Sequence, residues 1–162
     1  MKMVFCDIDG TLYRENEQIS PLNKEALTRF RDAGGQVVYC TGRHILEMNK
    51  ILEQDGYPFD YLVLNNGGAI LDSNKETLYE KHIEQSIGLD ILQWGVEANM
   101  FVHMCDGKNS YGCFNHQSFA HSDMGNIPIP DDYMTLMKES PSFQIISLNQ
   151  EDNQIDRINI IK

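Results

Sequence analysis

The sequence has few basic residues, few cysteines and no long apolar stretch, and each shortage excludes a class of protein. Its 162 residues include 13 Lys and Arg against 24 Asp and Glu, a net charge of −11, which argues against a nucleic-acid partner because phosphates are bound by clustered cations. No apolar run approaches the roughly 18 residues of a membrane span, and an aspartate interrupts any signal-peptide core in the opening MKMVFCDIDG. The four cysteines form neither a dense framework nor a CxxC pair, so we expect a reduced, cytoplasmic protein without a membrane partner.

The first third of the chain alternates apolar runs with amphipathic segments. Three short runs have the nearly continuous hydrophobicity of buried parallel strands. Ser20 and Pro21 suit the start of a helix, and Gly34 suits its end. A second helix is predicted from about His44 to Gln54, and the predicted strands are Met3–Cys6, Gln36–Cys40 and Tyr61–Leu64. This order predicts an α/β fold with a parallel sheet and right-handed crossover connections.

After Gly67 and Gly68 the pattern changes. Apolar runs on both sides of the sequence DSNKE predict a β-hairpin, and helices beside antiparallel strands then predict a separate α+β module. The predicted elements are hairpin strands Ala69–Leu71 and Thr77–Tyr79, helices Ser86–Ala98 and Asp131–Glu139, and strands Met100–Cys105, Tyr111–Phe114, Phe143–Leu148 and Ile155–Ile161. We therefore expect two domains, residues 1–79 and 80–162.

The strongest functional signal is the pair Asp7 and Asp9, directly after the first predicted strand. Side chains in an extended chain repeat every two residues, so both carboxylates project to one side at the carboxyl end of a parallel strand, where α/β sheets bind ligands. Gly10 permits a tight turn, and the Thr11 hydroxyl can brace it. Carboxylates this close repel unless a cation bridges them or one holds a proton, and hard oxygen ligands select Mg²⁺. The alternative is a pair of solvated turn aspartates.

The second signal is the run Thr41, Gly42 and Arg43 between the second strand and the second helix. A hydroxyl, a glycine amide and the unpaired N–H groups of a helix start make an anion site, although a threonine here is also an ordinary helix cap. Its place beside the two aspartates favours phosphate binding. The third strand ends in NNGG, where Asn66 lies at the same sheet edge, and this segment is equally well explained as a simple turn.

These three segments resemble the haloacid dehalogenase (HAD) superfamily of aspartate-nucleophile phosphatases, most closely its Cof-like sugar-phosphatase branch with a type IIB cap. FCDIDGTL matches the first motif of the superfamily, and VVYCTGR resembles the second motif of the Cof branch. NNGGAI is similar to the NGAxI segment of that branch, with Gly68 in place of alanine. The resemblance implies a partial HAD-like Rossmannoid core with an inserted α+β cap. It also implies a Mg²⁺-dependent phosphatase that acts on a small phosphorylated metabolite of the sugar-phosphate class.

The resemblance further implies roles for individual residues. Asp7 is the expected nucleophile that forms an aspartyl-phosphate, and Asp9 is the expected general acid/base. The Asp7 carboxylate and the Asp9 main-chain carbonyl are the expected Mg²⁺ ligands, and Thr41 is expected to hold the transferring phosphoryl group. The expected phosphate- or substrate-binding residues are Gly10, Thr11, Thr41, Gly42, Arg43 and Asn66.

The resemblance is specific over residues 1–70 and only topological from residue 80 onward. The family continues past its cap with a lysine and then an acidic pair that completes the metal site. Lys162 follows a strand-like run, and Asp131 and Asp132 lie in the predicted cap, so we expect an N-terminal part of a longer enzyme. Two alternatives stay open: a catalytically incomplete fragment that acts as a binding module or half-enzyme, and a phosphomutase-type phosphotransferase.

A weaker candidate site lies in the predicted cap. His103 and Cys105 on one predicted strand, with Cys113 and His116 on or just after the next, supply four ligands for a tetrahedral Zn²⁺ site. The alternative is that these cysteines are small buried hydrophobic residues.

Three residues next to the expected catalytic loops have simpler interpretations. We expect Cys6 and Cys40 to serve in core packing rather than redox chemistry. We expect His44, directly after the TGR run, to be a solvated residue of the first helical turn rather than a substrate contact.

An incomplete parallel sheet also has a physical consequence. Three strands with two crossover helices leave an open edge and an uncovered apolar face, which we expect around Val4, Val38 and Val63. The sequence therefore predicts self-association of the chain through the core sheet.

Overall fold

A computed structural model describes residues 2–13, 18–55, 57–98, 100–107, 110–113 and 144–149 of the chain. The chain divides into two compact units, Met1–Lys81 and His82–Lys162. Several predicted features lie outside the described residues: helix Asp131–Glu139, strand Ile155–Ile161, His116 and Lys162.

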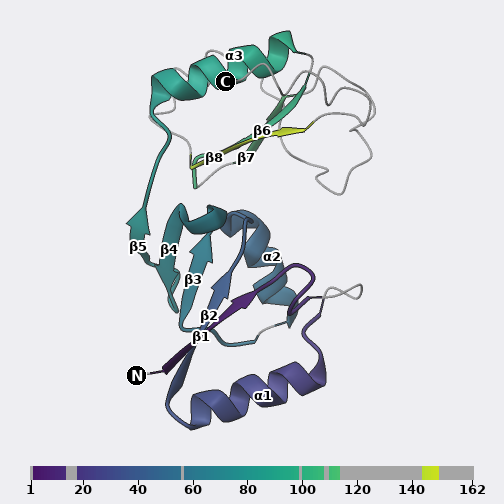
Figure 1. Cartoon of the computed structure of the whole chain (residues 1–162), viewed down its shortest axis with the longest axis vertical. Coiled ribbons are helices and arrows are strands. Elements are labelled where there is room, and N and C mark those ends of the chain that lie inside the picture. The colour runs from purple at the N-terminus through teal and green to yellow at the C-terminus, as the bar shows by residue number, and fades with distance from the viewer. Residues whose placement is uncertain are drawn as a thin grey trace. The chain divides into compact units, whose positions relative to one another are not determined.

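The first unit is built on one five-stranded sheet in the order β1-β2-β3-β4-β5 (Figure 1). The first three strands pair in parallel, and the last three pair antiparallel as a hairpin added to β3. The α/β fold class and the hairpin are therefore confirmed. Its elements are β1 (Lys2–Asp7), α1 (Pro21–Asp32), β2 (Gly35–Cys40), α2 (Ile45–Asp55), β3 (Tyr61–Leu64), the short helix η1 (Asn65–Gly67), β4 (Ala69–Asp72) and β5 (Thr77–Glu80).

Helix α1 begins and ends where the sequence predicts. The Ser20 hydroxyl accepts a hydrogen bond from the Asn23 N–H at 3.2 Å, and Pro21 lies in the first turn, where no N–H partner is needed. The chain leaves the helix at Gly34, whose φ of +81° favours glycine. Gly35 then opens β2 against the Phe30 ring, and a side chain at this position would clash with that ring.

The hydrophobic core lies on one face of the sheet, and both crossover helices contribute to it. Leu27 of α1 and Met48 of α2 are buried together with Ile8, which follows β1. Alternate strand positions complete the core, because side chains of a strand point to opposite faces in turn. These are Cys6, Val37, Tyr39, Leu62, Leu64, Ala69 and Leu71.

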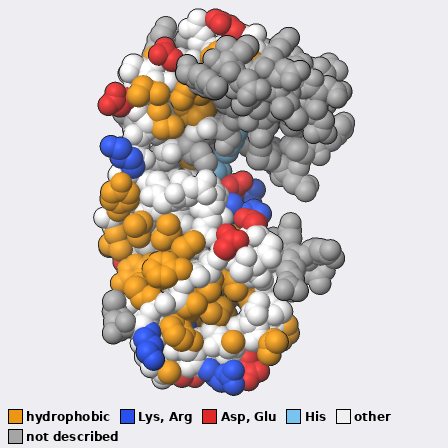
Figure 2. All heavy atoms as spheres, viewed as in Figure 1, with side chains coloured by type: hydrophobic (Ala, Val, Ile, Leu, Met, Phe, Trp, Pro, Cys, Tyr) orange, Lys and Arg blue, Asp and Glu red, His pale blue; other side chains and the backbone are white. Residues whose placement is uncertain are grey.

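The opposite face of the sheet has no helix on it in the described part of the first unit. Phe5 is 63% exposed and Met3 is 37% exposed, both on β1, which is an edge strand of the described sheet. Figure 2 shows hydrophobic side chains gathered over the strands of the first unit. The prediction for Val4 is wrong, since Val4 pairs with a core residue and packs against the helix-covered side. Val38 lies on the uncovered face with Phe5 but is itself fully buried.

The second unit combines one helix with a three-stranded antiparallel sheet in the order β7-β6-β8. Helix α3 packs on β6, and Leu92, Met100 and Met104 are buried. The described elements are α3 (Gln85–Glu97), β6 (Phe101–Cys105), β7 (Ser110–Cys113) and β8 (Ile145–Asn149), which confirms the predicted strand pair and helix. Among the residues described in both units, no helix has the length and apolarity that a bilayer crossing needs.

Candidate active site

The loops that follow β2 and β3 are joined by main-chain hydrogen bonds. The Thr41 N–H donates to the Val63 carbonyl at 2.9 Å, and the Asn66 N–H donates back to the Thr41 carbonyl at 3.2 Å. A third bond runs from the Asn65 N–H to the Arg43 carbonyl at 3.1 Å. The parallel strands therefore bring the TGR and NNGG segments, which are more than 20 residues apart, into one structural unit.

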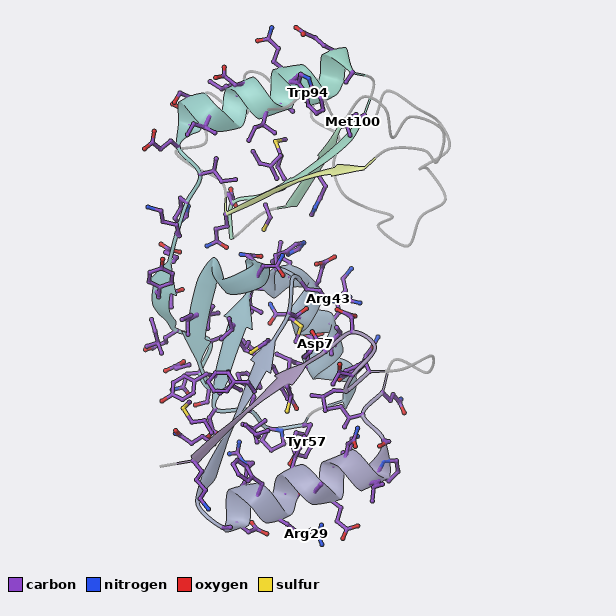
Figure 3. The ribbon with its side chains drawn as sticks, viewed as in Figure 1. Asp7, Arg29, Arg43, Tyr57, Trp94 and Met100 are labelled. Carbon is purple, nitrogen blue, oxygen red and sulfur yellow. The ribbon has the colours of Figure 1, made fainter. Side chains whose placement is uncertain are left out.

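Asp7 is the last residue of β1 and is exposed at the same end of the sheet, close to Arg43 (Figure 3). The Thr11 hydroxyl donates to Asp7 Oδ2 at 3.0 Å. The turn between them is tight, because Gly10 has a φ of +76° and its N–H donates to the Tyr13 carbonyl at 2.9 Å. The threonine thus braces the turn and orients the carboxylate of Asp7.

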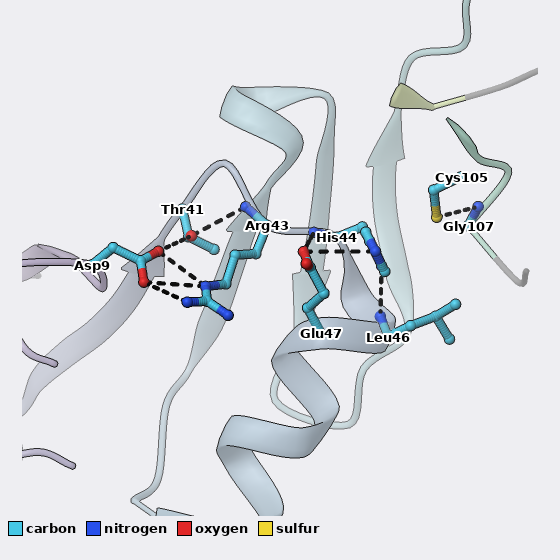
Figure 4. Close-up of polar contacts among 8 residues, drawn as sticks. All are labelled: Asp9, Thr41, Arg43, His44, Leu46, Glu47, Cys105 and Gly107. Carbon is cyan, nitrogen blue, oxygen red and sulfur yellow. Dashed lines mark hydrogen bonds and ion pairs between the residues drawn. The ribbon is translucent and has the colours of Figure 1, made fainter. Parts of the chain in front are cut away.

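Asp9 forms a two-pronged ion pair with Arg43 (Figure 4). The guanidinium donates from Nη2 to Oδ1 at 2.7 Å and from Nε to Oδ2 at 3.0 Å, and the Thr41 hydroxyl donates to Oδ2 at 3.4 Å. The hydrogen bonds from Arg43 hold the pKa of Asp9 below its ordinary value, against the opposing effect of partial burial. Arg43 therefore supplies part of the positive charge that the neighbouring carboxylates of Asp7 and Asp9 require.

Thr41 also caps the loop that carries this arginine. The residue is 6% exposed, and its side-chain oxygen accepts a hydrogen bond from the Arg43 N–H at 3.1 Å. One buried hydroxyl therefore contacts both partners of the Asp9–Arg43 pair.

Gly42 and Asn66 fit closely together. A Cβ on Gly42 would lie 3.1 Å from Asn66 Oδ1, so glycine leaves room for this amide beside the loop. The three residues Asn65–Gly67 all have positive φ, at 53°, 54° and 97°, a conformation that asparagine and glycine tolerate best. The NNGG segment is therefore a turn, and the turn also places the Asn66 amide against the predicted phosphate loop.

His44 differs from its prediction as a solvated residue. Its side chain is only 5% exposed, and Nδ1 accepts a hydrogen bond from the Leu46 N–H at 3.2 Å. Burial holds the pKa of His44 below its ordinary value, although the nearby Glu47 carboxylate opposes this shift. Glu47, three residues after the histidine, is a helix-start signal that sequence reasoning missed.

Cys40 lies directly across from Asp7 in the β1–β2 pairing. Burial raises the pKa of the Cys40 thiol, and the negative charge of Asp7 raises it further. Burial likewise raises the pKa of Cys6, which is a core residue as predicted. Both thiols are therefore held in the unreactive protonated form.

A model of the haloacid dehalogenase-like hydrolase family matches residues 4–161. The chain belongs to this family. It is 27% identical over 124 residues to the 5-amino-6-(5-phospho-D-ribitylamino)uracil phosphatase YwtE of Bacillus subtilis, covering 76% of this chain and 42% of that protein. It is 31% identical over 103 residues to the HMP-PP phosphatase of Yersinia pestis, covering 64% of this chain and 37% of that protein.

The fold agrees with this family. A solved sugar phosphatase of HAD subclass IIB superposes with a TM-score of 0.70 at 20% identity, covering 88% of this chain and 56% of that one. The predicted resemblance to the HAD superfamily is thus confirmed, and the fold is that of a subclass IIB member. The chain spans about two fifths of the length of the two curated relatives.

HAD phosphatases use Mg²⁺, and the donor atoms at this site suit that ion in part. The exposed Asp7 carboxylate and the main-chain carbonyl of Asp9 are hard oxygen ligands, which Mg²⁺ prefers. The Asp9 carboxylate is engaged by Arg43 instead. No group of three or more acidic, histidine or cysteine side chains suited to a metal occurs within the described ranges.

The zinc hypothesis fails on strand register. His103 pairs with Gly112 and Cys105 with Ser110, whereas Cys113 pairs with Val102. Positions one residue apart along a strand belong to opposite faces of a sheet, so the position of Cys113 belongs to the other face from those of His103 and Cys105. His116 lies outside the described residues. The position of Cys113 therefore does not share a face with those of His103 and Cys105.

Proposed function

We propose that the protein is a phosphohydrolase that cleaves the phosphate ester of a small phosphorylated metabolite through an aspartyl-phosphate. The observation that carries this proposal is the exposed Asp7 carboxylate beside the N-terminus of α2, where the Thr41–Arg43 loop offers a hydroxyl, the Gly42 N–H and a guanidinium. A carboxylate nucleophile next to anion-binding groups suits phosphoryl transfer. The two curated relatives are phosphatases, which supports the same class of reaction.

In the first proposed step, a carboxylate oxygen of Asp7 attacks phosphorus, and the bond between phosphorus and the ester oxygen breaks. Asp9 in its protonated form gives its proton to the departing alkoxide, which leaves as an alcohol. Water then attacks the aspartyl-phosphate and passes a proton to the Asp9 carboxylate, which releases inorganic phosphate and restores Asp7. The Thr41 hydroxyl and the Gly42 N–H hold the phosphoryl oxygens during both steps.

The Asp9–Arg43 pair constrains this scheme. Because the hydrogen bonds from Arg43 lower the pKa of Asp9, the pair keeps this carboxylate ionised. An ionised Asp9 is the form that the second step needs as its proton acceptor. For the first step, Arg43 has to release Asp9, and a phosphate ester beside the loop offers the guanidinium a new anionic partner. Mg²⁺, held by the Asp7 carboxylate and the Asp9 carbonyl, would supply neutralisation of the negative charge on the phosphoryl oxygens.

The roles that we propose for the two units are those that the family resemblance implies. We propose that residues 1–79 form part of the catalytic core and that residues 80–162 form the cap, which selects the substrate. A sugar phosphate is the proposed substrate class, because the matched subclass IIB structure is a sugar phosphatase. The free thiols of Cys6, Cys40 and Cys105 support a cytoplasmic location.

A second candidate is a phosphate-binding module or half-enzyme without turnover. It is favoured by the share of the relatives that the chain spans, 42% and 37%. Phosphate release from a panel of sugar phosphates, with and without Mg²⁺, tests the first proposal, with Asp7→Asn as the control. Release above that control supports hydrolysis. Binding of inorganic phosphate without any release supports the second candidate.

A further inference from the structure

His44 is a buried histidine placed between the proposed phosphate loop and helix α2. It lies at the N-cap position, since its carbonyl accepts the first helical hydrogen bond from the Met48 N–H at 3.1 Å. With a side chain 5% exposed, it is unsuited to contact a substrate. Its role must therefore come from what it holds in place.

The contacts of His44 are those of a helix cap. Its ring nitrogen Nδ1 accepts from the Leu46 N–H at 3.2 Å, in the second position of the helix, as the side-chain oxygen of a Ser or Asn cap does. The Glu47 carboxylate accepts from the His44 N–H at 3.3 Å, which completes a reciprocal pair of capping bonds (Figure 4).

This cap requires the neutral ring. Because Nδ1 accepts a hydrogen bond, the single proton of the neutral imidazole resides on Nε2. A second proton would go to Nδ1, where it would face the Leu46 N–H and remove the capping bond. The charged groups that act on the ring are Glu47, whose Oε2 is 3.6 Å from Nε2, and Lys50, both on α2.

The loop before His44 is held at both ends. On one side the Thr41 N–H donates to the Val63 carbonyl, and on the other side the Arg43 carbonyl accepts from the Asn65 N–H, directly before the capped residue. Between these two anchors lies the main-chain N–H group of Gly42, whereas the Arg43 N–H already donates to the Thr41 hydroxyl. Loss of the cap would therefore loosen the second end of the segment that also aims the guanidinium at Asp9.

We propose that His44 is a positioning residue of the phosphate site, whose neutral imidazole caps α2 and thereby fixes the Thr41–Arg43 loop for anion binding. This inference rests on the proposed function of that loop. It predicts that anion affinity depends on the protonation of a residue that never touches the anion.

The test measures the affinity of the full chain for inorganic phosphate at pH 8 and for sulfate from pH 8 to pH 5.5, because the charge of sulfate is constant over this range. His44→Ala should weaken phosphate binding about fivefold, the typical effect of losing one cap. His44→Asn, a cap that does not titrate, should restore it. Sulfate affinity of the native chain should fall as the pH drops below the ordinary histidine value, and His44→Asn should remove this fall.

Ser20→Ala is the matched control, because it removes the cap of α1 at a site outside the loop. It should lower the free energy of unfolding without changing anion affinity. Equal phosphate affinity in native chain and His44→Ala, or the same pH profile in native chain and His44→Asn, would overturn the inference while leaving the phosphate site intact. Absence of phosphate and sulfate binding to the native chain would instead overturn the proposed site and this inference together.

Discussion

Replacing Thr41 by valine tests the geometry on which the proposed function depends. Valine has nearly the shape of threonine, so the substitution removes the hydroxyl and leaves the packing almost unchanged. The hydroxyl is buried, accepts from the Arg43 N–H at 3.1 Å, and donates to Asp9 at 3.4 Å. Valine leaves that N–H without its acceptor at a position mostly screened from water.

The magnitude follows from these contacts. A neutral hydrogen bond contributes about 1 kcal/mol net, and an unsatisfied buried donor costs about 1–3 kcal/mol, while the 3.4 Å contact with Asp9 adds little. We expect Thr41→Val to lower the free energy of unfolding of the first unit by about 1–2 kcal/mol. Phosphate affinity should fall about tenfold, because the hydroxyl is also a proposed phosphoryl ligand.

The assay has to report on the first unit. The single tryptophan, Trp94, lies in the second unit, so its fluorescence follows that unit instead. Hydrogen exchange at the Arg43 amide, read by NMR, reports the bond directly, and Thr41→Ser serves as the control that keeps the hydroxyl. An Arg43 amide that exchanges at the same rate in Thr41→Val as in the native chain would refute the reasoning.

Four further predictions concern the same site and sheet. Asp7→Asn should abolish any turnover while thermal stability holds or rises, because one charge of the acidic pair is removed; turnover near the native rate would remove Asp7 from the mechanism. Calorimetry should show Mg²⁺ binding in the millimolar range, since the described residues supply few of six oxygen ligands, and micromolar affinity would contradict this. Gly42→Ala should weaken phosphate binding by crowding Asn66 at 3.1 Å, and Asn66→Ala should partly rescue it. The chain should associate with a second copy along the unprotected β1 edge in light scattering, Phe5→Glu should reduce this, and a native chain that is monomeric at every concentration would count against it.

The strands, helices and most of their limits were predictable from the sequence. Local chemistry sets them: Pro21 cannot continue a preceding helix, Gly34 adopts a φ that other residues avoid, and short apolar runs form buried strands. The placement of Asp7 and Thr41 at one sheet edge was also predictable. Once three strands are parallel, their carboxyl ends must meet.

The partners of the side chains were decided by the tertiary structure. Arg43 contacts Asp9 across 34 positions in sequence, and no local pattern distinguishes this pair from an arginine that faces the phosphate. The same holds for His44, whose neighbours in sequence are those of an ordinary first helical turn, although the folded chain buries it.

The face of a sheet on which a strand residue lies is likewise decided only by how the strands pair. The sequence was enough to predict the strands that carry Val4, Val38, His103, Cys105 and Cys113. It was not enough to predict which of these residues share a face. A shift of one residue in register moves every side chain of a strand to the other face. The tertiary structure therefore packed Val4 against the core and put the position of Cys113 on the other face from those of His103 and Cys105, because register is set by packing between strands and not by the residues of one strand alone.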